Sequence, residues 1–374
     1  MSYPRFKSRQ GGAALIVALL VFALASALMV GLQRDFSLQL QRGANSLVQE
    51  QSWSYLRGAE GLAAAALRLD SEQDKAKDAP RDDLSEVWAS EARRYPLPEG
   101  GWLLGELEDL QGRLNLNNLL DEPNQSANAG SADPDPETDF TETDSQSQTN
   151  DPNTENVSGG AGSDEERRFT SGQKQLIRLL QTLEGLGVDQ TQAIALTEAI
   201  SDYMDADDQR RLAGAEDEAY RNGVPPYRPA NQPIASVSEL RAIAGITPEI
   251  YAALAPLVTV WPLEGSKLNI LTAKPAVLRT INSDDRLEPL SLGDAQRLVE
   301  LRERGEINEV EDLLTDIAFS DTAMNDIANV LGTTSDWFLL SASVQIADRE
   351  QRLYSVLQRN ERRVVSRYRS LGEL

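Results

Sequence analysis

The chain has 374 residues and a formal net charge of −23, and it contains neither cysteine nor histidine. A chain without cysteine has no disulfide, no thiolate nucleophile and no soft-metal site. The lack of histidine excludes a Ser-His-Asp triad and removes the commonest zinc ligand. The negative charge argues against nucleic acid as a partner and suits hard divalent cations, and the length is sufficient for two or three domains.

The N-terminal region carries the clearest pattern. Three basic residues, Arg5, Lys7 and Arg9, precede an unbroken apolar run from Ala13 to Leu32. As a helix this run is about 30 Å long, which is the thickness of the hydrocarbon core of a membrane. Positive charges before such a helix predict a cytoplasmic N-terminus and an exported C-terminal bulk.

Three interpretations of the apolar run remain open. It is typical of a secretory signal peptide if it is cut near Ala25–Ala27, and of a plain membrane anchor if it is not cut. The third is a leader removed between Gly12 and Ala13, which leaves the helix on the mature protein. The Gly-Gly pair at the boundary between charged and apolar residues favours this third interpretation. Such a helix resembles the N-terminus of type IV pilins and pseudopilins, whose leaders are removed by a prepilin peptidase.

The fifth residue after the expected cleavage site separates members of that family. Most pilin-like subunits carry a glutamate there, taken to neutralise the N-terminal amine of a neighbouring subunit. Counted from Ala13, the fifth residue is Val17. In this the chain resembles the minor pseudopilin K of type II secretion, which lacks the acid. Because a buried carboxylate without its partner is costly, its absence implies a subunit with no neighbour beyond it, at a tip. The resemblance also implies N-methylation of the first mature residue, although Ala13 stands where Phe is usual.

The next elements are predicted from periodicity. The helical pattern continues from Ala13 to about Asp70, and residues 71–82 form a charged loop. A short helix is expected over Leu84–Arg93. Two strands follow, Trp102–Leu107 and Gly112–Asn117, with a turn near Asp109.

Residues 121–166 are acidic and almost without apolar side chains, so we expect them to be disordered. From Phe169 to about Leu331 the pattern is helical. Two helical pairs within it look like internal relatives of one module: 237–244 with 248–257, and 275–281 with 291–304. Strands are expected over 337–347, 353–357 and 363–368.

The predicted fold is therefore α+β, with a pilin-like long N-terminal helix and an antiparallel sheet. A large all-α insertion, SAM-like or helix-hairpin-helix-like, interrupts the sheet. The expected divisions are a leader, a transmembrane assembly helix, a first pseudopilin part, the acidic loop, the helical domain and the C-terminal strands: 1–12, 13–32, 33–120, 121–166, 167–335 and 336–374.

An acidic cluster follows the helix predicted near residues 193–203. Concentrated carboxylates repel one another unless a cation holds them, and Ca²⁺ takes six to eight oxygen ligands. The spacing is not that of an EF-hand, and a solvated acidic loop is the alternative interpretation. The candidate ligands are Asp202, Asp205, Asp207, Asp208, Glu216, Asp217 and Glu218.

Further segments carry the resemblance to minor pseudopilin K: Asp202–Asp208, Gly214–Asp217, Pro225–Arg228, Ala230–Pro233, Gly112–Asn117 and Lys267–Ile270. The resemblance implies a calcium-binding helical domain in a pseudopilin that caps the pseudopilus. The implied partners are minor pseudopilins I and J and, through them, pseudopilin H and the major pseudopilin. The implied location is the inner membrane, in a single pass, with a periplasmic C-terminal domain that promotes protein secretion across the outer membrane.

A membrane-anchored DNA-binding protein is the alternative, because the helical pairs resemble helix-hairpin-helix modules. In those modules a Gly-x-Gly turn points backbone amides at phosphate. Here Gly245 is followed by Ile246 and Thr247, so the second glycine is absent. No Walker loop, nucleophile elbow or dinucleotide fingerprint is present in the sequence, and we therefore expect no enzyme.

Overall fold

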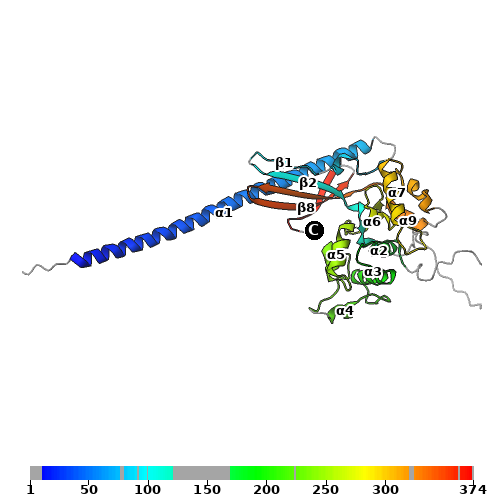
Figure 1. Ribbon diagram of the computed structural model, residues 1–374, viewed down its shortest axis with the longest axis horizontal. Coiled ribbons are helices and arrows are strands. Elements are labelled where there is room, and N and C mark those ends of the chain that lie inside the picture. The colour runs from blue at the N-terminus through cyan, green and yellow to red at the C-terminus, as the bar shows by residue number, and fades with distance from the viewer. Residues whose placement is uncertain are drawn as a thin grey trace, which may run out of the picture. The chain divides into compact units, whose positions relative to one another are not determined.

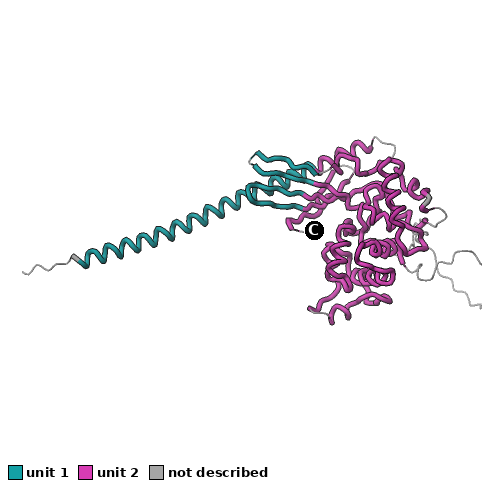
Figure 2. The backbone as a smooth tube through the Cα atoms, viewed as in Figure 1, with its two compact units in different colours: residues 1–62, 92–105, 342–353 teal, residues 63–91, 106–341, 354–374 magenta. Residues whose placement is uncertain are grey.

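A computed structural model describes residues 11–75, 80–90, 92–98, 100–120, 169–222, 225–319, 324–360 and 363–372. Residues 1–10 of the predicted leader and the acidic 121–166 segment, for which we predicted cleavage and disorder, lie outside the described residues. The chain divides into two compact units (Figure 2): residues 1–62, 92–105 and 342–353 in the first, and 63–91, 106–341 and 354–374 in the second.

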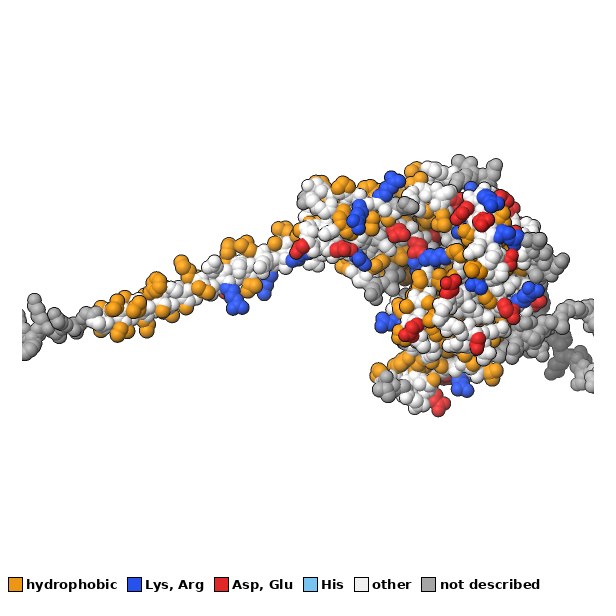
Figure 3. All heavy atoms as spheres, viewed as in Figure 1, with side chains coloured by type: hydrophobic (Ala, Val, Ile, Leu, Met, Phe, Trp, Pro, Cys, Tyr) orange, Lys and Arg blue, Asp and Glu red, His pale blue; other side chains and the backbone are white. Residues whose placement is uncertain are grey.

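Helix α1 spans Gly11–Asp74, which confirms the predicted long helix and extends it by one turn. Its N-terminal part is rich in alanine and leucine, which favour helix, and contains no proline. Among the described residues it is the one helix long and apolar enough to cross a membrane. Apolar side chains stand exposed along this N-terminal half (Figure 3). A helix of this kind needs an apolar environment outside the chain.

Five strands form the main sheet, in the order β1-β2-β7-β8-β9 (Figure 1). Their bounds are Tyr95–Pro96, Trp102–Asp109, Trp337–Ile346, Arg349–Asn360 and Arg363–Ser370. The pairs β1–β2 and β8–β9 are antiparallel, and β8–β9 contains a bulge at Val356/Leu357. The sheet therefore joins strands from before and after the helical region, as predicted. A tight turn, in which Ala347 adopts a φ of 56°, connects β7 to β8.

The predicted strand Gly112–Asn117 is wrong in length and in partner. Only β3, Leu114–Asn115, is extended, and it pairs in parallel with β4, Val258–Thr259, outside the main sheet. The alternation of leucine and asparagine does not separate a buried face from a solvated one, because both residue types are buried. The amide of Asn117 donates to the carbonyls of Ile234 and Val260 at 3.2 and 3.0 Å. The asparagines thus connect β3 to distant loops.

The short helix expected over 84–93 is reduced to a 3₁₀ turn, Val87–Ala89. Trp88 is buried there and meets the ring of Phe338 edge-on, with 5.1 Å between ring centroids. This segment is therefore held by the packing of one aromatic side chain and does not form the amphipathic helix that periodicity suggested.

The region between the strands is mainly helical, as predicted, with short 3₁₀ segments between the helices. Helices α2 and α3 form its largest pair and contribute many of the buried leucines and isoleucines. Strands β5 and β6 form a second parallel pair that was not predicted. The bounds are α2 Ser171–Gln181, α3 Gln190–Met204, α4 Asp217–Arg221, α5 Pro248–Leu254, β5 Leu268–Asn269, α6 Pro275–Leu278, α7 Leu292–Glu303, α8 Val310–Leu314, α9 Asn325–Asn329 and β6 Leu331–Gly332.

Two segments of the helical region resemble each other, but they are not the two helical pairs that were predicted to be related. Each parallel pair begins with a Leu-Asn strand whose asparagine accepts the amide N–H two residues later, at 3.0 Å for Asn115 and 2.9 Å for Asn269. The second strand of each pair comes at the end of a similar segment. That segment starts with a capping box and continues through a short helix to the strand. The related segments are thus 236–259 and 309–332, whereas 275–304 contains helices of four and twelve residues with no such box.

Arg178 fixes α2 in this region. Its guanidinium is fully buried and donates to the carbonyls of Thr280, Ser283 and Arg286 at 2.8, 2.7 and 2.6 Å. Burial lowers the pKa of Arg178 to about 10. Three carbonyl acceptors on one loop satisfy the donors of a buried cation, so this loop is held against α2.

Candidate functional site

The acidic cluster occupies the connection from α3 to α4 (Figure 1). Helix α3 ends because Asp205 adopts extended backbone angles, and α4 begins after Glu216, whose side chain accepts the N–H of Asp217. The end of α3 and the start of α4 therefore bring carboxylates that are eleven positions apart in the sequence to one place.

Three of the predicted residues form a compact group. Asp205, Asp207 and Glu216 each offer a carboxylate oxygen, and these oxygens all lie within 4.8 Å of one another. Glu216 is 5% exposed, and its Oε1 has no hydrogen-bond partner among the described residues. Oδ1 of Asp205 is likewise buried without a described partner. Buried acceptors are normally satisfied, so these two oxygens are suited to a cation.

Asn231 provides a further oxygen at this end of α3. Its backbone N–H donates to the carbonyl of Tyr203 at 3.0 Å, and its φ of 45° is unusual for a residue other than glycine. Its amide Oδ1 is buried and has no described hydrogen-bond partner. The sequence prediction named only acids, so Asn231 was not among the candidate ligands, although Ala230–Pro233 was part of the resemblance.

The electrostatics of the group favour a bound cation. Burial, together with the charges of Asp202, Asp205 and Asp207, raises the pKa of Glu216 to about 7. Burial also raises the pKa of Asp205, against the influence of Arg211. Carboxylates whose charges oppose one another in this way gain from a divalent cation that interacts with all of them.

Asp202 is buried behind the group. It is fully inaccessible, and both of its oxygens accept the backbone N–H of Arg211, at 3.4 and 3.2 Å. The guanidinium of Arg211 donates to Asp202 at 2.6 Å and also to Asp205. Gly214 lies so close that a Cβ there would collide with the Asp202 carboxylate. Asp202 therefore orders the loop.

The remaining predicted acids lie outside the compact group. Asp208 and Glu218 are exposed. Asp217 lies in the first turn of α4 and forms an ion pair with Arg221. Adjacency in sequence placed these residues in the candidate list, but their side chains are not among the grouped oxygens.

A second acidic group was not predicted. Oxygens of Asp70, Asp74, Asp82 and Glu86 lie within 4.8 Å of one another, in the second unit. The buried Arg359 donates to Asp70 at 2.9 Å and to both oxygens of Asp82 at 2.6 Å. Burial raises the pKa of Asp70 to about 6 and that of Asp82 to about 7. This group contains its own cation.

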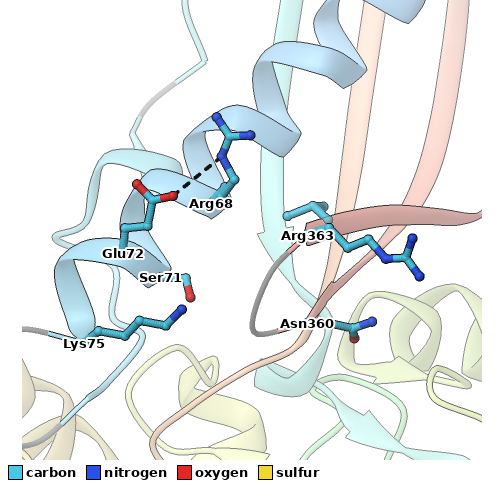
Figure 4. A pocket seen from close by; sticks show the side chains of 7 residues that line it. Arg68, Ser71, Glu72, Lys75, Asn360 and Arg363 are labelled. Carbon is cyan, nitrogen blue, oxygen red and sulfur yellow. Dashed lines mark ion pairs between the residues drawn. The ribbon is translucent and has the colours of Figure 1, made fainter.

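A pocket in the same unit is lined by three cationic side chains, one acidic side chain and three uncharged residues (Figure 4). Its volume is about 240 Å³, and Arg68 pairs with Glu72 across 3.9 Å at its edge. The lining residues are Arg68, Ser71, Glu72, Lys75, Asn360, Arg363 and Val364.

Comparison with known proteins identifies the family. Two models described as type II secretion system (T2SS), protein K match residues 112–263 and 268–334. The type II secretion system protein K of Pseudomonas aeruginosa is 30% identical over 355 residues, which cover 94% of this chain and 90% of that protein. That of Aeromonas hydrophila is 29% identical over 358 residues, with 94% of each chain covered. This chain belongs to the type II secretion system protein K family.

Membership makes the protein a minor pseudopilin of the type II secretion system, a structural component. The pilin-like fold also agrees with a solved structure. A chain of the GspK-GspI-GspJ complex from enterotoxigenic Escherichia coli matches with a TM-score of 0.66 at 23% identity, covering 89% of this chain and all of that one. The DNA-binding alternative finds no support in these comparisons.

Proposed function

We propose that this pseudopilin caps the pseudopilus and promotes its assembly. We further propose that valine at position 17 is what suits the subunit to the tip. The apolar part of α1 is exposed along its length, and Val17 is 60% exposed. In a filament such a surface is covered by neighbouring helices. A glutamate at this position requires the amine of the next subunit, and valine requires none. A subunit with valine at position 17 is suited to the end of the filament.

The proposed partners are minor pseudopilins I and J, which connect this subunit to pseudopilin H and the major pseudopilin. The likeness in fold to a chain of the GspK-GspI-GspJ complex supports this assignment. The chain provides a long exposed helix for lateral contacts within the filament.

A Ca²⁺ site in the α3–α4 connection is the second part of the proposal. Asp205, Asp207 and Glu216 are its acidic ligands, and Asn231 supplies an amide oxygen. A bound cation connects the end of α3 to the start of α4 and so stabilises this loop in a chain that has no cysteine. What supports it is the set of buried oxygens that have no hydrogen-bond partner in the described part of the chain.

Processing and location complete the proposal. A prepilin peptidase removes the leader after Gly12, Ala13 becomes the N-methylated first residue, and α1 anchors the chain in the inner membrane with its C-terminal part in the periplasm. The length and composition of α1 support a single-pass anchor. The mass of the mature N-terminus tests this directly. A start at Ala13 is expected; a start at Met1 leaves a plain anchor, and a start near Ala27 or beyond contradicts the tip assignment.

Position 17 is tested by the variant Val17→Glu, with Val17→Gln as an uncharged control of similar length. We expect the glutamate to impair pseudopilus assembly and secretion of the cell's type II substrates, because its charge lacks a neighbour's amine. The glutamine variant should retain most of both. Normal assembly with Val17→Glu, scored by filament imaging and secretion assay, contradicts placement at the tip.

A further inference from the structure

Arg211 lies between the buried and the exposed parts of the acidic loop. Its Nη1 donates to Oδ1 of Asp202 at 2.6 Å and to Oδ2 of Asp205. Its side chain is 35% exposed, whereas that of Asp202 is inaccessible. One guanidinium therefore interacts with two carboxylates at the edge of the candidate cation site.

This arrangement removes ligand oxygens from the site. Asp202 is enclosed between Arg211 and Gly214, and it is not part of the group formed by Asp205, Asp207 and Glu216. Asp205 is divided, because its Oδ2 accepts from Arg211 while its Oδ1 has no described partner. Affinity for Ca²⁺ depends on the number of charged ligands, so each carboxylate held by Arg211 weakens the site.

We propose that Arg211 is an internal competitor for the cation, and that it sets the affinity of the site by holding Asp202 and one oxygen of Asp205. The proposal rests on the calcium site proposed above and adds its regulation. Ca²⁺ binding then proceeds against the Arg211 ion pairs. At low Ca²⁺ concentration the guanidinium of Arg211 stays on these carboxylates and neutralises part of their charge.

The test is a Ca²⁺ titration of the full-length protein in detergent, by calorimetry or by competition with a fluorescent chelator. Arg211→Gln should bind Ca²⁺ about tenfold more tightly than the unaltered protein, because one competing positive charge is removed a few ångströms from the ligands. Arg210→Gln is the matched control, since it removes the same charge from the adjacent, exposed position. Its dissociation constant should stay within about twofold.

The outcomes are distinct. Equal or weaker binding by Arg211→Gln overturns the role of Arg211, and equal tightening by Arg210→Gln overturns it too. If the unaltered protein binds no Ca²⁺, the calcium site itself is wrong and the inference fails with it. Should Arg211→Gln not fold, the double variant Asp202→Asn with Arg211→Gln removes both partners of the buried pair. It should bind Ca²⁺ more tightly than Asp202→Asn alone, which keeps Arg211 on Asp205, and binding that is not tighter overturns the proposal.

Discussion

The described part of the chain contains two compact acidic groups, and an arginine interacts with each in a different way. Around Arg359 the cation is buried, contacts Asp70 and Asp82, and also donates to the carbonyl of Ser335 at 2.6 Å. In the α3–α4 connection Arg211 stands at the edge and leaves oxygens of Asp205 and Glu216 without described partners. The carboxylate oxygens are similarly spaced in the two groups, yet the group around Arg359 is suited to a structural role and the group near Arg211 to binding a ligand.

The surroundings explain the difference. Next to Arg359, Asp109 is buried and accepts from Asn269, Thr272 and Ser335 at 3.1, 2.5 and 2.6 Å. These donors belong to the polypeptide, so the Asp109 carboxylate needs no external cation. Proximity of carboxylates alone does not identify a metal site. The informative observation is how the chain itself neutralises them: Arg359 is buried and contacts both Asp70 and Asp82, whereas Arg211 stands at the edge of its group.

Removal of the buried cation should have the largest effect. Arg359→Met leaves Asp70 and Asp82 without their common partner, and we expect it to lower the free energy of unfolding by about 3–5 kcal/mol. Urea unfolding of the full-length protein in detergent measures this. Arg304→Met is the control, because Arg304 forms an exposed pair with Glu300 and should cost less than about 1 kcal/mol. A loss below about 1 kcal/mol for Arg359→Met contradicts the structural role.

Added Ca²⁺ should separate the two groups. At one hundred times the dissociation constant it should stabilise the protein by about 2.7 kcal/mol. Glu216→Gln and Asp205→Asn should abolish this gain, whereas the exposed Asp208→Asn should retain it. Thermal unfolding with and without Ca²⁺ gives the comparison. If Asp70→Asn removes the gain instead, Ca²⁺ binds at the acidic group around Arg359, which contradicts the proposed site in the α3–α4 connection.

The pH dependence of stability tests the same buried acids without a substitution. The pKa values of Asp70 and Asp82, about 6 and about 7 in the folded protein, lie above their unfolded values. The folded state therefore binds more protons, and the stabilisation is complete below about pH 4 and is lost as the pH rises through 6 to 7. In a chelating buffer we expect the free energy of unfolding to fall from pH 5 to pH 8, with the larger share from Asp82, whose folded pKa is the higher of the two.

A matched pair of variants tests which groups cause the fall in the free energy of unfolding with pH. Asp82→Asn removes one of the two groups and should flatten the profile, while Asp208→Asn should leave it unchanged. Glu216 has a raised pKa as well and contributes in the same direction, so Glu216→Gln measures its share. Stability that increases from pH 5 to pH 8 in the unaltered protein contradicts the proton uptake assigned to these buried acids.

The sequence by itself determined the long N-terminal helix, the missing acid at position 17, the exclusion of cysteine and histidine chemistry, and the C-terminal strands. These features depend on local patterns: an apolar run, residue identity and period-two alternation. It also located the acidic cluster, since the acids are close together along the chain.

Only the tertiary structure decided which of those acids belong together. Asp202, Asp208 and Glu218 are neighbours of the grouped residues in sequence, yet one is buried against Arg211 and the others face solvent. Asn231 and Arg211 gain their importance from contacts made across loops. The same holds for Asn115 and Asn269, whose strands find partners far along the chain, and for Arg359, which is 289 positions from Asp70. Local patterns carry no signal for such pairings, because the donors and acceptors meet only when distant segments pack together.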